Sequence, residues 1–180
     1  MAAFVYEPTF QHGPDDTPYR LLTRDFVSMA KLEGEGREYL RVAPEGLRLL
    51  AREAFNEIAF YLRPGHLQRL RDELADPEAS NNDRFVIYTH LQNAVTASAG
   101  LLPICQDTGT AIVMGKKGRY VLSEGDDAEA LSAGVFDAYQ EKNLRYSQLA
   151  PVEMGKEKNT GTNLPAQIDL LAETGGAGDS

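Results

Sequence analysis

Residues 44–64 read PEGLRLLAREAFNEIAFYLRP, and this stretch determines the expected fold. Pro44 suits the first turn of a helix, Glu45 beside it favours the positive end of the helix dipole, and Pro64 ends the helix. Apolar side chains recur at the three-and-four spacing of one helix face. They are Leu47, Leu50, Ala51, Ala54, Phe55, Ile58 and Leu62. We therefore predict a helix of about four turns with one buried face.

Two further helices are predicted directly after it. Pro64 opens the second helix, which ends at Asp76-Pro77. The third begins at a cap within residues 80–83 and ends near Gly100, because glycine accepts the backbone conformation that terminates helices. Its predicted buried stripe consists of Phe85, Tyr88, Leu91 and Val95.

A fourth helix is predicted from Asp126, where Glu129 three residues later resembles a capping box. It runs to about Leu144, and its predicted inner face comprises Leu131, Val135, Ala138 and Tyr139. Thr23 or Asp25 is a candidate cap for a short turn nearer the N-terminus.

Short strands are predicted around the helices. They cover residues 21–23, 39–42, 111–115, 119–122 and 166–172, and the third and fourth form a hairpin with Gly118 at positive φ. Residues 147–165 are polar and rich in turn formers. The predicted class is α+β, a mostly helical domain with a small mixed β-sheet. We divide the chain into an extended N-terminal arm with short strands (1–43), a helical/β domain (44–174) and a flexible tail (175–180).

Composition narrows the function classes. The chain has 180 residues and a net charge of −9, so we expect no nucleic-acid partner, which would need a basic face. No apolar run approaches the roughly 20 residues that span a bilayer, and we expect no membrane association. The chain has one cysteine, which cannot form an internal disulfide, and the N-terminus lacks a secretory pattern. We therefore expect a reducing, cytoplasmic setting.

The stretch LPICQDTGT, residues 102–110, is the candidate site because it places the only cysteine in a loop between a helix and a strand. A lone cysteine is most often a small buried apolar residue. A nucleophilic thiol would need a base, and none of the three histidines is close to Cys105 in sequence. Gln106 and Asp107 suit a turn, and Arg145 suits the C-terminal end of the fourth helix, where a cation is favourable.

Three segments resemble class I fumarases, which are iron–sulfur hydro-lyases. They are PICQDTGT with GKKG (103–110 and 115–118), NLRYS (143–147) and NTGTNLPAQID (159–169). The resemblance covers almost the whole chain and fails only in the last residues. It implies that this chain is the N-terminal portion of a larger two-domain enzyme, so that the domain over residues 44–174 is incomplete. A strand near the C-terminal end without a partner gives the same expectation.

The resemblance also implies roles for individual residues. Cys105 matches one of three thiolate ligands of a [4Fe–4S] cluster, whose other two cysteines lie outside this chain. Gln106 and Arg145 match residues that bind a substrate carboxylate, and Asp107 matches a catalytic residue that transfers a proton. The implied reaction is reversible hydration of fumarate to (S)-malate by a homodimer. Since this chain has one cysteine, we expect it to be inactive alone. We expect the 159–163 loop to be structural and to line the cluster pocket.

Three alternatives stay open at this point. The first is a tartrate dehydratase-type hydro-lyase acting on another small dicarboxylate. The second is a non-catalytic truncated chain that binds a partner subunit. The third is a thiol enzyme with Cys105 as nucleophile.

Overall fold

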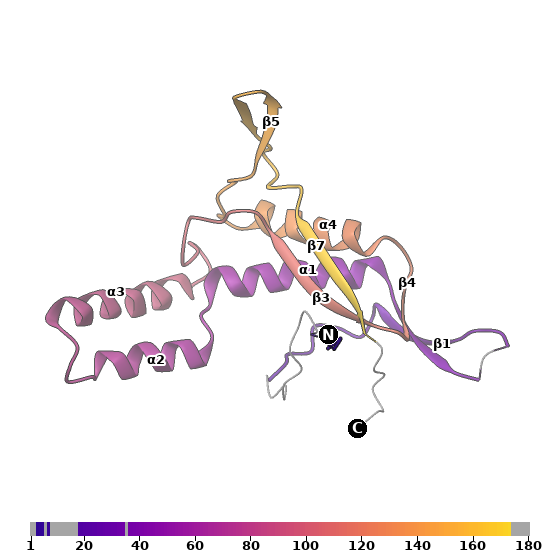
Figure 1. Ribbon diagram of the computed structural model, residues 1–180, viewed down its shortest axis with the longest axis horizontal. Helices are drawn as coiled ribbons and strands as arrows, with labels where there is room; N and C mark the ends of the chain where they lie inside the picture. Colours follow the sequence, from indigo (N-terminus) through magenta and orange to yellow (C-terminus); the bar gives the residue numbers. More distant parts are fainter. Residues whose placement is uncertain (1–2, 6, 8–17, 35, 174–180) are drawn as a thin grey trace.

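The protein has an α+β fold in which four helices support three small sheets within the described residues (Figure 1). The structure is a computed structural model that describes residues 3–5, 7, 18–34 and 36–173. The helices are α1 (Pro44–Phe60), α2 (Pro64–Leu74), α3 (Asn81–Ala97) and α4 (Asp127–Glu141). The strands are β1 (Val27–Lys31), β2 (Glu38–Val42), β3 (Ile112–Gly118), β4 (Val121–Ser123), β5 (Leu149–Glu153), β6 (Lys156–Asn159) and β7 (Gln167–Glu173). The predicted fold class is confirmed.

The centre of the fold is the close packing of α1 against α4. A Cβ built on Gly134 of α4 would lie 2.2 Å from the Arg48 carbonyl oxygen and 2.7 Å from the Ala51 Cβ, so no larger residue fits. Glycine within a helix is unfavourable by about 1 kcal/mol relative to alanine. The close approach of α1 explains why glycine is nevertheless found at this position of α4. The adjoining core holds the fully buried Phe60 and Val135, with strand and loop residues packed around them.

Salt bridges join α1 and α4 on the exposed side of this helix pair. The Arg48 guanidinium donates from Nε to Asp137 Oδ2 at 2.5 Å and from Nη2 to Oδ1 at 2.7 Å. Arg52 pairs with Glu141 one turn further along, at 2.7 Å. The hydrogen bonds and charge of Arg48 hold the pKa of Asp137 below its usual range, and they outweigh its partial burial.

The strands form three separate sheets. In the first, β2 pairs antiparallel with β1 and parallel with β4. In the second, β3 and β7 pair in parallel, with Ile112 opposite Gln167, and Figure 1 shows this pair lying across the two central helices. The third is the β5–β6 hairpin, which extends away from the helices at the top of the view.

The predicted helix starts are confirmed. α1 and α2 each have proline at the first helical position, and Asp126 caps α4 by accepting from the backbone N–H groups of Ala128 and Glu129. Ser80 caps α3 in a capping box, with its hydroxyl accepting from Asp83 N at 3.2 Å. The buried face of α4, the strand at residues 39–42 and the last strand also agree with prediction. Asp25 N donates to Thr23 Oγ1, as expected for a short turn.

Several strand predictions are wrong. The first strand is β1 rather than residues 21–23, because pairing with β2 selects residues 27–31. Residues 111–122 form no hairpin, since β3 and β4 join different sheets. Lys117, expected in the turn, lies inside β3 and reaches Asp127 at 2.5 Å. The predicted loop at residues 147–165 contains the β5–β6 hairpin, and α4 ends at Glu141 rather than near Leu144.

The predicted buried stripe of α3 is largely exposed. Phe85 is 68% exposed and Val95 74% exposed, and Tyr88 is exposed as well. The reason is that α3 packs on α2 and this helix pair extends away from α1 and α4, so its outer face has no described neighbour (Figure 1).

No helix in the described part of the chain combines the length and apolar character that a membrane crossing requires. The predicted tail at residues 175–180 and much of the predicted arm before residue 18 lie outside the described residues.

We predict that Gly134→Ala lowers the free energy of unfolding by about 1–3 kcal/mol, because the added methyl group overlaps the α1 backbone. Chemical denaturation of the 180-residue chain measures this change. The matched control is Gly65→Ala in α2, where an added Cβ meets nothing within 4 Å. That variant should be neutral or slightly stabilising. Equal destabilisation of both variants would show that the α1–α4 contact is not close.

We predict that Asp137→Asn destabilises the chain at pH 7, by on the order of 1 kcal/mol for a well-aligned ion pair. Because the folded-state pKa of Asp137 is lowered, this stabilisation is present above the unfolded pKa and is lost as pH falls through the folded one. The difference between the variant and the parent should therefore shrink below about pH 4. The control is Asp72→Asn at the exposed Arg71–Asp72 pair, which should change little at either pH. A pH-independent difference would contradict the assignment.

Candidate functional site

The loop that carries the cysteine is fixed by its backbone. Ile104 N donates to the Ala59 carbonyl of α1 at 2.9 Å, and the Asn93 side chain of α3 donates to the Ile104 carbonyl at 2.8 Å. Both polar groups of this residue are thus held by helices. Cys105 follows immediately, so its position is set by α1 and α3 rather than by the loop alone.

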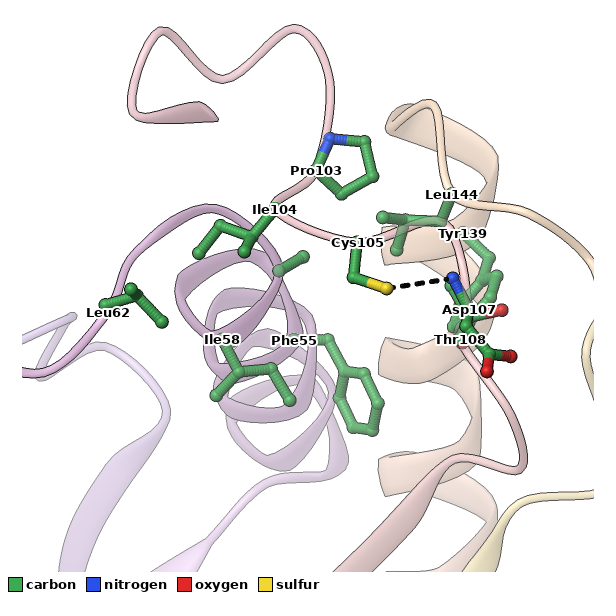
Figure 2. A pocket seen from close by; sticks show the side chains of 11 residues that line it. Phe55, Ile58, Leu62, Pro103, Ile104, Cys105, Asp107, Thr108, Tyr139 and Leu144 are labelled. Carbon is green, nitrogen blue, oxygen red and sulfur yellow. Dashed lines mark hydrogen bonds between the residues drawn. The ribbon is translucent and has the colours of Figure 1, made fainter. Parts of the chain in front are cut away.

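An open pocket of about 270 Å³ lies beside this loop. Figure 2 shows Phe55 and Ile58 contributed by α1 and Leu62 by the segment that follows it, with Tyr139 and Leu144 near the end of α4. Burial raises the pKa of the Tyr139 phenol above its ordinary value. The pocket is therefore apolar at its helical wall, and its polar groups come from the loop.

Cys105 contributes an exposed thiol to this pocket. The backbone N–H of Asp107 donates to its Sγ at 3.4 Å, drawn as the dashed line in Figure 2. Hydrogen bonds to the ligand sulfurs are among the features that tune iron–sulfur clusters. Among the residues that the structure describes, no group of three or more His, Cys, Asp or Glu side chains could hold a metal ion by itself.

Arg145 contacts Asp107, which lines the pocket, although Arg145 is not itself among the lining residues. Arg145 Nη2 lies 3.4 Å from Asp107 Oδ1, and the two side chains are 56% and 83% exposed. This is a long contact, which leaves other N–H groups of the guanidinium open to a ligand. Arg145 lies three residues beyond Lys142, the C-cap of α4, so its position does not match the alternative role of a helix-terminal cation.

The Arg145 segment is joined to the cysteine loop by hydroxyl groups. Thr108 Oγ1 donates to the Arg145 carbonyl, and it lies 2.9 Å from Ser147 Oγ. Ser147 Oγ in turn donates to the Gly109 carbonyl at 3.1 Å. The elements that carry Cys105, Asp107 and Arg145 therefore form one connected unit.

A buried amide completes this connection. Asn163 is 0% exposed and has a φ of 55°, in the left-handed region that asparagine tolerates better than most residues. Its Oδ1 accepts from Ser147 N at 2.8 Å and Gln148 N at 2.9 Å, and its Nδ2 donates to the Gly109 carbonyl at 3.0 Å. Asn163 falls in the polar loop predicted at residues 159–163, and its buried role was not predicted. An asparagine between Thr162 and an apolar Leu-Pro pair was the available signal.

The remaining candidate residues are placed differently. Gln106 is exposed on the loop and is not among the residues that line the pocket. Of the histidines that the structure describes, His66 lies on α2 and His90 on α3, and neither lines the pocket. Cys105 thus has no described histidine as a neighbouring base, which disfavours the thiol-enzyme alternative.

Comparison with known proteins identifies the family. The sequence profile described as "Fumarate hydratase (Fumerase)" matches residues 48–178, which include every site residue described above. The chain belongs to the fumarate hydratase family. The class I fumarase resemblance inferred from its motifs is therefore confirmed.

Three relatives illustrate the range of this family. "Fumarate hydratase class I, aerobic" of Escherichia coli K12 is 55% identical over 172 residues, covering 96% of this chain and 31% of the relative. "Fumarate hydratase 1, mitochondrial" of Leishmania major is 54% identical, covering 97% and 32%. A Methanocaldococcus jannaschii protein provisionally named L(+)-tartrate dehydratase subunit alpha is 29% identical, covering 70% and 49%. The chain thus spans about a third of the length of its fumarate hydratase relatives.

Proposed function

We propose that this chain is part of a [4Fe–4S]-dependent hydro-lyase that interconverts fumarate and (S)-malate by reversible hydration. The observation that carries the proposal is the pocket itself, which is lined by the exposed Cys105 thiol and by Asp107, with the Arg145 guanidinium 3.4 Å from the Asp107 carboxylate. Membership of the fumarate hydratase family supports the reaction class.

Arg145 binds a substrate carboxylate in this proposal. A guanidinium has five N–H donors in a planar fork that matches a carboxylate, and here one long hydrogen bond of 3.4 Å to Asp107 uses only one of them. Gln106 supports the same carboxylate through its amide from the adjoining loop position. Two polar anchors at one end of a dicarboxylate would orient its central carbons toward Asp107 and Cys105.

Asp107 transfers a proton to or from a substrate carbon. Its side chain is exposed and lines the pocket, and Arg145 beside it restrains the carboxylate. Because Asp107 N also donates to Cys105 Sγ, the backbone of the proton-transfer residue is held relative to the thiol. The distance between the proposed proton-transfer group and the proposed metal ligand is therefore set within residues 105–107.

Cys105 provides one thiolate ligand to the cluster. The residues present fit this role, since the thiol is exposed, lines the pocket and accepts a backbone N–H. When bound, a cluster with one open iron supplies a Lewis acid at the substrate hydroxyl group. The chain has a single cysteine, so we propose that the other two thiolates come from the part of the enzyme that matches the rest of the relatives.

We also infer a cytosolic homodimer. The lone cysteine supports a reducing compartment, and one relative is named as mitochondrial. The homodimer rests on the family resemblance. The α2–α3 pair and the pocket mouth expose apolar side chains that a larger assembly would cover.

A tartrate dehydratase-type activity is the second candidate. It is favoured only by the Methanocaldococcus relative, whose identity of 29% is much lower than that of the fumarate hydratases. The same carboxylate-binding residues would serve either substrate. Assays with malate and tartrate on one protein preparation separate the two activities.

The test protein is a chimaera in which this chain replaces the matching 172 residues of the Escherichia coli relative. After anaerobic cluster reconstitution, we expect the chimaera to hydrate fumarate and the 180-residue chain alone to be inactive. A chimaera that binds the cluster but turns over no fumarate would contradict the proposed function. Activity of the isolated chain would contradict the need for ligands from elsewhere.

In this chimaera, Cys105→Ser should abolish both the cluster and turnover, because a hydroxyl is a poor substitute for a soft thiolate. Iron content and visible absorbance measure the first, and malate dehydration measures the second. Ser98→Ala, at the end of α3 and away from the pocket lining, is the control and should leave both unchanged. A brown, active Cys105→Ser protein would show that this thiol is not a ligand.

Arg145→Lys should lower kcat/KM for malate about tenfold or more, roughly 1.4 kcal/mol, because lysine keeps the charge but loses the planar fork. Kinetics are compared at matched iron content. Arg71→Lys on the exposed face of α2 is the matched control and should be silent. A change under about twofold at Arg145 would leave it with no role in substrate binding.

A further inference from the structure

Asn163 lies where three segments of the site meet. It is fully buried, and its three hydrogen bonds reach Gly109 on the cysteine loop and Ser147 and Gln148 on the segment after Arg145. Gly109 lies 54 residues away from Asn163 in sequence, and Ser147 lies 16 residues away. A side chain that only closed its own turn would bond to near neighbours instead.

The chemistry of these bonds fits an amide specifically. Two partners are N–H donors and the third is a carbonyl, so the side chain must accept on one atom and donate from the other. A carboxylate accepts but cannot donate. An apolar side chain would leave the Ser147 and Gln148 N–H groups without this acceptor, and the Gly109 carbonyl would keep only the Ser147 hydroxyl. The positive φ restricts the position further, because it is unfavourable for most residues other than glycine and asparagine.

We propose that Asn163 is a positioning residue that holds the Cys105–Asp107 loop against the Arg145 segment. It fixes the Gly109 carbonyl two residues after Asp107 and the Ser147 and Gln148 amides two and three residues after Arg145. The separation between the Asp107 carboxylate and the Arg145 guanidinium therefore depends on an amide that touches neither. The consequence for catalysis rests on the proposed function, whereas the positioning of Cys105 does not.

The first test uses thiol labelling of the 180-residue chain. Cys105 is its only cysteine, so the labelling rate measures the accessibility of this thiol alone. Asn163→Asp keeps both acceptor bonds and loses the bond to the Gly109 carbonyl, and Asn163→Gly keeps the backbone conformation and loses all three. Both should raise the iodoacetamide labelling rate about threefold or more, by freeing the loop. Ser80→Ala, which removes the α3 cap far from the site, is the matched control and should leave the rate unchanged. Equal rates in all four proteins would overturn the proposal.

Amide hydrogen exchange shows whether each variant still folds. In the parent chain, Ser147 and Gln148 amides should be protected although they lie outside the helices and the strand ladders. The protection should persist in Asn163→Asp and be lost in Asn163→Gly, while β3 and β7 stay protected in both. Unprotected Ser147 and Gln148 amides in the parent would overturn the proposal without any variant.

The second test measures malate kinetics in the chimaera at matched iron content. Asn163→Asp should raise KM about tenfold with a smaller change in kcat, because a displaced Arg145 weakens substrate binding. Ser80→Ala should change neither. A lower melting temperature with unchanged KM would show a structural role only and overturn the positioning role. An inactive parent chimaera would instead contradict the proposed function, and the labelling and exchange results would still decide the role of Asn163.

Discussion

The contact between Gly134 and the α1 backbone is the constraint on which the rest of the structure depends. With no side chain at this position, α4 lies directly against Arg48 and Ala51, and the two helices form one rigid support. The last turns of α1 and the end of α4 then provide Phe55, Ile58 and Tyr139 to the same pocket wall. Moving the helices apart would widen that wall and shift the loop anchored on Ala59.

The site is built in two stages on this support. Helices fix the loop before Cys105 through the backbone of Ile104, and a buried amide fixes the loop after Asp107 through Gly109. The groups proposed to bind iron and substrate remain exposed between these two anchors. Such an arrangement allows reactive side chains to face a ligand while the backbone that carries them stays ordered.

The sequence predicted those parts of the fold that depend on local chemistry. Helix starts followed from Pro44, Pro64 and cap candidates within residues 80–83, and the inner face of α4 followed from helical spacing. Strands depend on partners distant in sequence, and for this reason the hairpin expected at residues 111–122 proved to be two strands in different sheets. The α3 stripe had helical periodicity, yet periodicity says nothing of what covers a face, and Phe85 is exposed.

The candidate site shows the same division. The motif resemblance placed Cys105, Gln106, Asp107 and Arg145. In the structure Cys105 and Asp107 line the pocket and Arg145 contacts Asp107, whereas Gln106 is exposed on the loop and outside the lining. Asn163 was not identified, because its role consists of bonds to Gly109 and Ser147 that no local pattern encodes. Gly134 was missed for a similar reason, although a glycine within a helix is itself a sign of close packing.

The central claim is that Cys105, Asp107 and Arg145 form one side of a dicarboxylate site. A crystal structure of the reconstituted chimaera with bound malate tests it most directly. The account predicts a malate carboxylate hydrogen-bonded to the Arg145 guanidinium, with Cys105 Sγ bound to iron and Asp107 beside the substrate carbons. Malate bound elsewhere, or Arg145 facing solvent beside an iron-free Cys105, would contradict it.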